Sequence, residues 1–253
     1  MKNLLIVALF FSFNSFAGIS IISDLDDTIK VTHSDDFTDS FGYGTSRRKV
    51  YLGMPELLEE SRQYVNEVSV VTASPRILRF NVNRLLKKNK IKADRVVLNG
   101  NIRRPGHVEF KVKAIKKIMD STTDQYILLG DDVGNDPEIY DEIIKLYPGR
   151  VLGSYIHVVN NRTVPESSIT YFTTFELAVK EFLAGRLSKE SVSRVSNAIM
   201  KEKDLEAVFP EFAHCPKDAS PYAWLSKTDF ASEASMLTEK LVTYCKTEWE
   251  EED

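Results

Sequence analysis

Two patterns of apolar and polar residues alternate along the chain. Short apolar runs rich in Val and Ile are typical of buried strands, and longer segments with apolar residues three or four positions apart are typical of helices that cover a sheet. The predicted strands are residues 19–23, 68–72, 95–98, 126–129 and 151–159. The predicted helices between them are residues 55–66, 76–89, 109–120 and 137–147. This alternation predicts an α/β fold with a doubly wound parallel sheet.

Strand patterns largely stop after residue 165. Three helical segments follow, at residues 174–184, 189–203 and 231–249. We therefore divide the chain into an α/β domain at residues 18–165 and a helical C-terminal region at residues 166–253. This region is either a helical appendage packed on the α/β core or a small second domain.

The first 17 residues are typical of a secretory signal peptide. Lys2 precedes an apolar run from Leu4 to Phe13, and small residues stand at positions −3 and −1 of a cleavage site after Ala17. The run is shorter than the roughly 20 residues that span a bilayer, and a buried N-terminal strand or helix is the alternative. We expect an exported chain that begins at Gly18, is periplasmic or secreted, and has no transmembrane segment.

Two cysteines, Cys215 and Cys245, lie 30 residues apart in the C-terminal region. In an oxidising compartment they are a disulfide candidate, and two free buried thiols are the alternative. The four histidines have no metal-ligand spacing with these cysteines, which argues against a zinc site.

Composition excludes disorder and a multi-span membrane protein, since the 253 residues are 43% hydrophobic and 28% charged. The net charge of −4 by itself predicts no nucleic-acid binding. Its distribution is uneven. Residues 72–117 contain 14 Lys and Arg but two acids, whereas residues 166–253 contain 10 bases and 17 acids. The basic stretch therefore favours an anionic partner.

Acidic residues follow the first predicted strand in the segment Asp24-Leu25-Asp26-Asp27-Thr28. Ligands bind at the carboxyl ends of strands in open α/β sheets, and side chains two residues apart project to the same side of an extended chain. One of Asp24 and Asp26 can act as a nucleophile and the other, when protonated, as a general acid. A turn or a helix cap is the alternative.

Three further segments place polar side chains near later strand ends. Thr72 ends the second strand, where its hydroxyl can bind a phosphoryl oxygen or cap the next helix. Lys111 can neutralise charge at a phosphoryl group, or it is a solvated surface residue. The fourth strand runs into residues 130–136, whose carboxylates can complete an Mg²⁺ site. The last of these, Asp136, can also cap the helix that begins at Pro137.

In this order, the acids, hydroxyl, lysine and acids resemble the four motifs of the haloacid dehalogenase (HAD) superfamily, which transfers phosphoryl groups through an aspartyl phosphate. The closer resemblance is to the catalytic domain of the actin-patch-associated Mg²⁺-dependent phosphatidate phosphatases, distant relatives of lipins. It covers about residues 19–160. It rests on Ile22-Ser23-Asp24-Leu25-Asp26-Asp27-Thr28-Ile29-Lys30, Ala73-Ser74-Pro75, Glu109-Phe110-Lys111, Gly130-Asp131 with Asp136-Pro137-Glu138-Ile139-Tyr140, and Tyr147-Pro148-Gly149-Arg150-Val151.

The resemblance implies a HAD-like, Rossmannoid sheet with a minimal cap and a role for each matching residue. Asp24 would be the nucleophile and would also contact Mg²⁺, and Asp26 would be the general acid and base with its carbonyl on the metal. Thr72 would bind the phosphoryl group, Lys111 would hold nucleophile and phosphate together, and Asp131 would ligate Mg²⁺.

The roles of two acids in the loop after the fourth predicted strand have two interpretations each. Asp132 stands where such phosphatases usually have Ser, and it is either a second metal ligand or a loop acid. Asp136 is either a metal ligand or the helix cap.

The gaps between motifs are too short for a large cap domain, so the site is expected to admit bulky substrates. Aromatic and basic residues fill the insert after the first motif, where they either dock an anionic lipid surface or form a flap packed on the core. They are Phe37, Phe41, Tyr43, Arg47, Arg48, Lys49 and Tyr51.

The sequence as a whole predicts an exported, Mg²⁺-dependent phosphomonoesterase of phosphatidate or a related phospholipid. A phosphatase of nucleotides, nucleic-acid ends or phosphoproteins is the first alternative. A non-catalytic binding module is the second, and the intact set of site residues argues against it.

Overall fold

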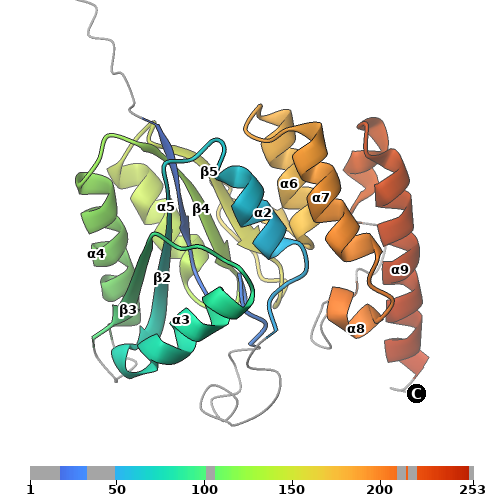
Figure 1. Ribbon diagram of the computed structural model, residues 1–253, viewed down its shortest axis with the longest axis horizontal. Helices are drawn as coiled ribbons and strands as arrows, with labels where there is room; N and C mark the ends of the chain where they lie inside the picture. Colours follow the sequence, from blue (N-terminus) through green and yellow to red (C-terminus); the bar gives the residue numbers. More distant parts are fainter. Residues whose placement is uncertain (1–17, 33–48, 101–105, 210–214, 216–220, 251–253) are drawn as a thin grey trace, which may run out of the picture.

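A single parallel sheet runs through the molecule (Figure 1). The computed structural model describes residues 18–32, 49–100, 106–209, 215 and 221–250. Within these residues the strand order is β3-β2-β1-β4-β5-β6, and every neighbouring pair is parallel. The strands are β1 (Ile19–Ser23), β2 (Glu67–Pro75), β3 (Arg95–Asn99), β4 (Gln125–Asp131), β5 (Val151–His157) and β6 (Ile169–Tyr171). The predicted doubly wound α/β fold is confirmed.

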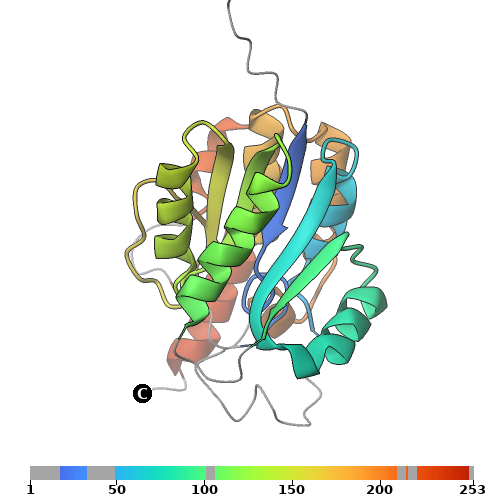
Figure 2. The same cartoon turned by 90° about the vertical axis from the view of Figure 1, so that its left-hand side faces the viewer.

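Helices cover both faces of the sheet because successive strand residues point to opposite sides. In β1, Ile21 enters the larger buried cluster and Ile22 the smaller one. The smaller cluster lies under α4 (His107–Asp120) and α5 (Asp136–Leu146), which stand in front of the sheet in Figure 2. The larger cluster lies under α2 (Met54–Ser61), α3 (Arg79–Lys88), α6 (Thr174–Leu183) and α7 (Lys189–Met200). A strand such as β4 is therefore buried almost throughout, and it is apolar from Tyr126 to Leu129.

The C-terminal region packs on the α/β core. Phe175 of α6 and Val192 of α7 belong to the same buried cluster as Ile21. Helix α9 (Ala231–Glu250) lies outside them and adds Leu237 and Leu241 to that cluster (Figure 1). The sheet itself extends past residue 165, since β6 pairs with β5, and this strand was not predicted.

Several predicted boundaries were wrong in detail. The predicted helix at residues 76–89 begins as a 3-10 turn, η2 (Arg76–Leu78), and only then becomes α3. Helix α2 ends at Ser61, before the predicted end, and Asn66, predicted to be helical, donates its backbone N–H to the carbonyl of Ile19. Helix α7 ends at Met200, three residues before the predicted end. Two short elements were not predicted: α8 (Leu205–Val208) and η3 (Ala223–Lys227).

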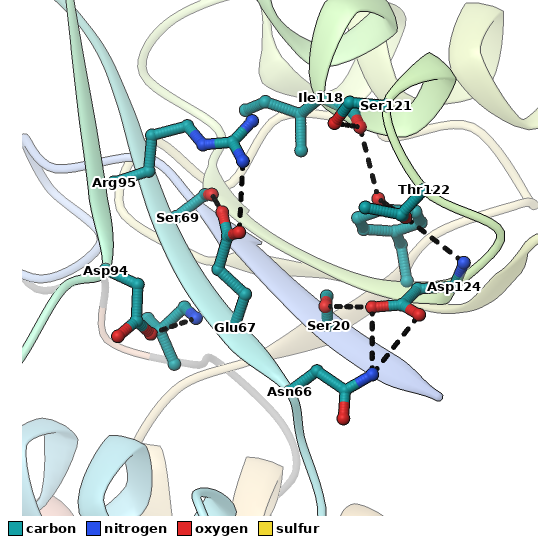
Figure 3. Close-up of polar contacts among 12 residues, drawn as sticks. Ser20, Asn66, Glu67, Ser69, Asp94, Arg95, Ile118, Ser121, Thr122 and Asp124 are labelled. Carbon is teal, nitrogen blue, oxygen red and sulfur yellow. Dashed lines mark hydrogen bonds and ion pairs between the residues drawn. The ribbon is translucent and has the colours of Figure 1, made fainter. Parts of the chain in front are cut away.

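Polar contacts tie together the strand ends farthest from the acidic residues (Figure 3). Asp124 accepts hydrogen bonds from the Ser20 hydroxyl at 2.7 Å and from the Asn66 amide at 3.2 Å. Arg150 donates to the backbone carbonyls of Asp124, at 2.6 Å, and of Met119, at 2.9 Å. Arg150 belongs to the last of the segments that resemble the phosphatidate phosphatases. It therefore holds the end of α4 and the start of β4 together and does not contribute to the candidate site.

Cys215 and Cys245 form a disulfide with a Cα–Cα separation of 5.7 Å, so the predicted pairing is confirmed. Within the described part of the chain, every helix is too short or too polar to cross a membrane. The predicted signal peptide at residues 1–17 lies outside that part.

Candidate active site

Asp24 follows β1 directly, at the edge where the parallel strands end. Its backbone N–H donates to the carbonyl of Leu129 in β4, which fixes it between two strands. The loop then turns back, because Lys30 donates its backbone N–H to Leu25 and Asp27 adopts a left-handed φ of 56°. Asp tolerates this conformation better than most residues. The loop is thus held tightly on both sides of the first acids.

Three buried carboxylates meet at this edge. One oxygen each from Asp24, Asp131 and Asp136 lie within 4.8 Å of one another. Lys111 reaches them from α4, with its Nζ 2.7 Å from Asp24 Oδ1 and 2.5 Å from Asp136 Oδ1. A Cβ on Gly130 would lie 2.7 Å from the Cβ of Asp136, so only glycine lets α5 approach β4 this closely.

Burial and mutual repulsion govern the protonation of this cluster. Burial raises the pKa of Asp24 to about 8, against the attraction of Lys111. Burial likewise raises the pKa of Asp131 well above its usual range, and Asp136 and Asp24 add to the rise. For Lys111, burial disfavours the charged form, but the attraction of Asp136 and Asp24 outweighs it and raises the pKa. When all three acids are ionised, one ammonium leaves two negative charges unbalanced.

The donor set fits a divalent cation. Asp136 is fully buried, and its Oδ2 has no hydrogen-bond partner among the described residues. A divalent cation that prefers oxygen ligands would balance the two excess charges and contact this oxygen. Asp24, Asp131 and Asp136 are the residues that could hold it.

Without metal, the stability of the protein is expected to fall as the pH rises from about 4 to about 8. Unfolded Asp24 loses its proton near pH 3.8, whereas in the fold it keeps the proton up to about pH 8, so unfolding releases a proton in this window. Thermal unfolding in EDTA across this range measures the trend. Added MgCl₂ should reduce the slope, and Asp24→Asn should reduce it without metal, whereas Asp131 and Glu176, whose pKa values burial also raises, keep part of it. An Asp24→Asn variant whose melting temperature in EDTA falls with pH as steeply as that of the wild type would contradict the raised pKa of Asp24.

Asp26 has a different set of partners from Asp24. Its carboxylate accepts hydrogen bonds from Lys30 Nζ at 3.0 Å, Ser74 Oγ at 3.1 Å and Thr72 Oγ1 at 3.3 Å. Burial raises its pKa, but the charge of Lys30 and the hydrogen bonds from Lys30, Thr32 and Ser74 outweigh that and lower the pKa below the usual value. Thr72, which was expected to bind the phosphoryl group, thus donates its hydroxyl to Asp26.

Asp132 lies apart from the three-carboxylate cluster. Its carboxylate accepts backbone hydrogen bonds from Val159 and Asn160, both at 2.7 Å, and from Arg162 at 3.1 Å. Both oxygens are therefore used to hold the loop after β5. The structure favours the loop-acid interpretation over a second metal ligand.

The cap interpretation of Asp136 was wrong. Asp136 is the first residue of α5, Asn135 stands at the N-cap without a side-chain bond, and Pro137 is the second helical residue. The carboxylate turns instead to Lys111, because the ammonium is a stronger partner than a backbone N–H.

Sequence reasoning missed three residues near the acids. Thr28 donates its hydroxyl to Asp131 Oδ2 at 3.3 Å, and Ser74 binds Asp26. His157 Nδ1 lies 2.8 Å from the carbonyl oxygen of Asp27, and its ring packs against Tyr51. Thr28 and Ser74 lie inside the segments that resemble the phosphatidate phosphatases, and His157 ends the strand beside β4. The position of each residue in the sequence could therefore have indicated that it lies near the acids.

Most of the aromatic and basic insert lies outside the described residues, namely Phe37, Phe41, Tyr43, Arg47 and Arg48. Of its remaining members, Lys49 is exposed and Tyr51 is buried in the larger core cluster. Tyr51 thus packs on the core, which agrees for this residue with the alternative that the insert forms a flap against the core.

Comparison with known proteins places the α/β part of the chain in a family. The sequence profile of the phosphatidate phosphatase APP1 catalytic domain matches residues 19–158. No curated protein matches the chain. A chain of the Pnkp1/Rnl/Hen1 RNA repair complex is similar at 15% identity and a TM-score of 0.42, over 65% of this chain and 48% of that one. The phosphoserine phosphatase from T. onnurineus, solved with NDSB-201, is similar at 14% identity and a TM-score of 0.42, over 68% of this chain and 95% of that one. The chain thus spans about half the length of the repair-complex chain.

Proposed function

The chain belongs to the family of the phosphatidate phosphatase APP1 catalytic domain and is therefore a phosphatase, and from this premise we propose a specific reaction. It is an Mg²⁺-dependent phosphomonoesterase that forms an aspartyl phosphate on Asp24, with phosphatidate or a related phospholipid as substrate. The contact of Lys111 with the buried Asp24, beside Asp131 and Asp136, is the observation that carries the proposal.

The chain's own residues supply a nucleophile and an acid. The reaction needs Asp24 ionised and Asp26 protonated, which is the reverse of the metal-free site. A cation on Asp24 would lower the pKa of that carboxyl, and phosphoryl oxygens beside Asp26 would raise the pKa of Asp26. A carboxylate oxygen of Asp24 then attacks phosphorus, the bond between phosphorus and the alcohol oxygen breaks, and the leaving oxygen takes a proton from Asp26. A water molecule then attacks the aspartyl phosphate and gives its proton to Asp26, and the bond between phosphorus and Asp24 breaks to release phosphate. Thr72 and Ser74 hold the Asp26 carboxylate in place for both transfers.

Positive charge at the site has two sources. Lys111 lies against the attacking carboxylate, and the attraction of Asp136 and Asp24 raises its pKa, which favours the charged ammonium. Mg²⁺, held by Asp24, Asp131 and Asp136, would supply Lewis-acid neutralisation of the phosphoryl oxygens.

Two features support a large substrate. The described chain between Thr72 and Lys111 is filled by η2, α3 and β3, which belong to the sheet and its covering layer rather than to a cap. The same stretch, residues 73–110, carries 10 Lys and Arg against two acids, which suits an anionic headgroup.

Phosphate release from a substrate panel tests the proposal directly. Dioleoyl phosphatidate, nucleotides and a phosphopeptide are compared in MgCl₂ and in EDTA, with Asp24→Asn as the blank. We expect Mg²⁺-dependent release that is fastest with phosphatidate. Faster release from nucleotides or the phosphopeptide would overturn the lipid assignment. Release that persists in EDTA would overturn the proposed dependence on Mg²⁺.

Replacing Asp26 with Asn is expected to slow hydrolysis of alkyl phosphates by about 10²–10⁴-fold, the usual contribution of a general acid or base. The loss should be smaller for p-nitrophenyl phosphate, because nitrophenolate leaves without a proton. Steady-state rates on both substrates measure the difference. Asp229→Asn, an exposed acid paired with Lys189, is the matched control and should keep normal rates. Equal losses in kcat/KM on both substrates, which reports the steps up to departure of the leaving group and not the shared hydrolysis step, would show that Asp26 does not protonate the leaving group.

We also propose export, for which the predicted signal peptide and the disulfide between Cys215 and Cys245 are the support. After expression with its leader, the intact mass should correspond to a chain that begins at Gly18 and lacks two hydrogens. Reduction is expected to lower the free energy of unfolding by about 3–4 kcal/mol, because the link closes a loop of about 30 residues in the unfolded chain. Urea denaturation with and without reductant measures this. A double Cys→Ser variant should be insensitive to reductant, and an uncleaved leader or two alkylated thiols would refute the proposal.

A further inference from the structure

Two large apolar side chains project into solvent beside the candidate site. Ile77 in η2 is 79% exposed and Phe80 in α3 is 73% exposed, the highest values among the large hydrophobic residues of the described chain. They are three residues apart, a spacing that places helical side chains side by side. Isolated exposed apolar residues are common, but an adjacent pair of this exposure marks an interaction surface.

The pair stands at the edge of the sheet where the acids lie. Strand β2 contributes Thr72 and Ser74 to the contacts of Asp26, ends at Pro75, and continues directly into η2. Ile77 is thus three residues beyond Ser74, within about 10 Å along even a fully extended chain. Figures 1 and 2 show this junction at the lower end of the sheet, where β1 also ends.

The surroundings of the pair are positively charged. Residues 72–93 contain seven Lys and Arg and no acid. The members of this basic set that lie in η2 and α3 are all exposed: Arg76, Arg79, Arg84, Lys87 and Lys88. The opposite side of α3 is apolar and buried in the larger core cluster through Val82, Leu85 and Leu86. The apolar pair and its cations are therefore presented on a helix that the core holds in place.

We propose that η2 and the first turn of α3 dock on an anionic lipid bilayer, with Ile77 and Phe80 at the boundary between headgroups and acyl chains. Exposed Arg and Lys beside apolar side chains are the combination that binds anionic membrane interfaces. A protein partner fits less well, because four of the seven cations in residues 72–93 are Lys, which is depleted in protein interfaces. A nucleic-acid strand would stack on Phe80 but would leave the aliphatic Ile77 unused.

Docking in this orientation turns the edge that carries Asp24 and Asp26 toward the headgroups. This consequence rests on the proposed phospholipid substrate, whereas docking itself does not.

The test separates docking from catalysis by using vesicles that contain no phosphatidate. Co-sedimentation is measured with phosphatidylcholine vesicles, with and without phosphatidylglycerol. The wild-type protein should bind only the anionic vesicles, and Ile77→Ser/Phe80→Ser should weaken this binding at least about tenfold. The matched control is Leu183→Ser/Met236→Ser, which changes two exposed apolar residues on α6 and α9 and should bind normally.

Soluble substrates distinguish the docking hypothesis from the hypothesis that the substrate is a phospholipid. All three proteins should hydrolyse p-nitrophenyl phosphate equally, because none of these substitutions touches the acids. Failure of the wild-type protein to bind anionic vesicles, or equal binding by Ile77→Ser/Phe80→Ser, would overturn the docking surface. Binding of an oligo-dT strand in place of vesicles, lost in the same variant, would also overturn it. Normal docking with no hydrolysis of water-soluble short-chain phosphatidate would instead refute the proposed substrate and leave the docking surface intact.

Discussion

Replacing Asp24 with Asn is expected to lower phosphate release from every substrate by at least about 10³-fold, because a neutral amide cannot form the aspartyl phosphate. Brief incubation with a ³²P-labelled substrate followed by acid quenching should trap a phosphoenzyme in the wild-type protein and none in the variant. Asp120→Asn, at the exposed end of α4, is the control and should keep full activity. Normal turnover by Asp24→Asn would remove the nucleophile assignment.

Replacing Lys111 with Met is expected to reduce kcat by about 10²–10³-fold, the usual cost of losing one preorganised electrostatic contact to the reacting group. Lys111→Met should also lower the melting temperature in EDTA at pH 8, since it removes the ammonium that faces Asp24 and Asp136. Asp24→Asn should raise that melting temperature, because it removes one of the repelling carboxylates. The two inactive variants are thus expected to shift stability in opposite directions.

Lys113→Met is the matched control for this pair. Lys113 lies two residues along α4 on the exposed side, so its loss should change neither activity nor stability. A Lys111→Met variant that keeps wild-type kcat, or one that melts higher than wild type in EDTA, would show that the ammonium does not govern the cluster.

The strands that the sequence predicted well are those buried on both faces. In β4 the run from Tyr126 to Leu129 is apolar because α5 covers one face and the larger core cluster the other. Strand β6 has three residues, two of them exposed, so no alternating or continuous apolar pattern marks it. It forms because β5 offers it an edge, which is a tertiary effect that no local pattern encodes.

The site was predictable to the extent that strand ends determine it. Asp24 and Asp131 end neighbouring parallel strands, so a parallel sheet brings them together. The orientations of Asp132 and Asp136 depend on how the loop after β4 folds, and Gly130 decides the approach of α5 there. Sequence spacing alone left the roles of both acids open for this reason.

A nascent chain that ends at residue 165 would lack the helices that complete one face of its sheet. Phe175, Leu177 and Val192, which share the buried cluster of Ile21, would still be inside the ribosome or not yet synthesised. Stable folding would therefore wait for the last third of the polypeptide, since an uncovered apolar face cannot offset the entropy lost on ordering. For the export proposed above, this delay would be useful, because a translocation channel threads polypeptides that have not yet folded.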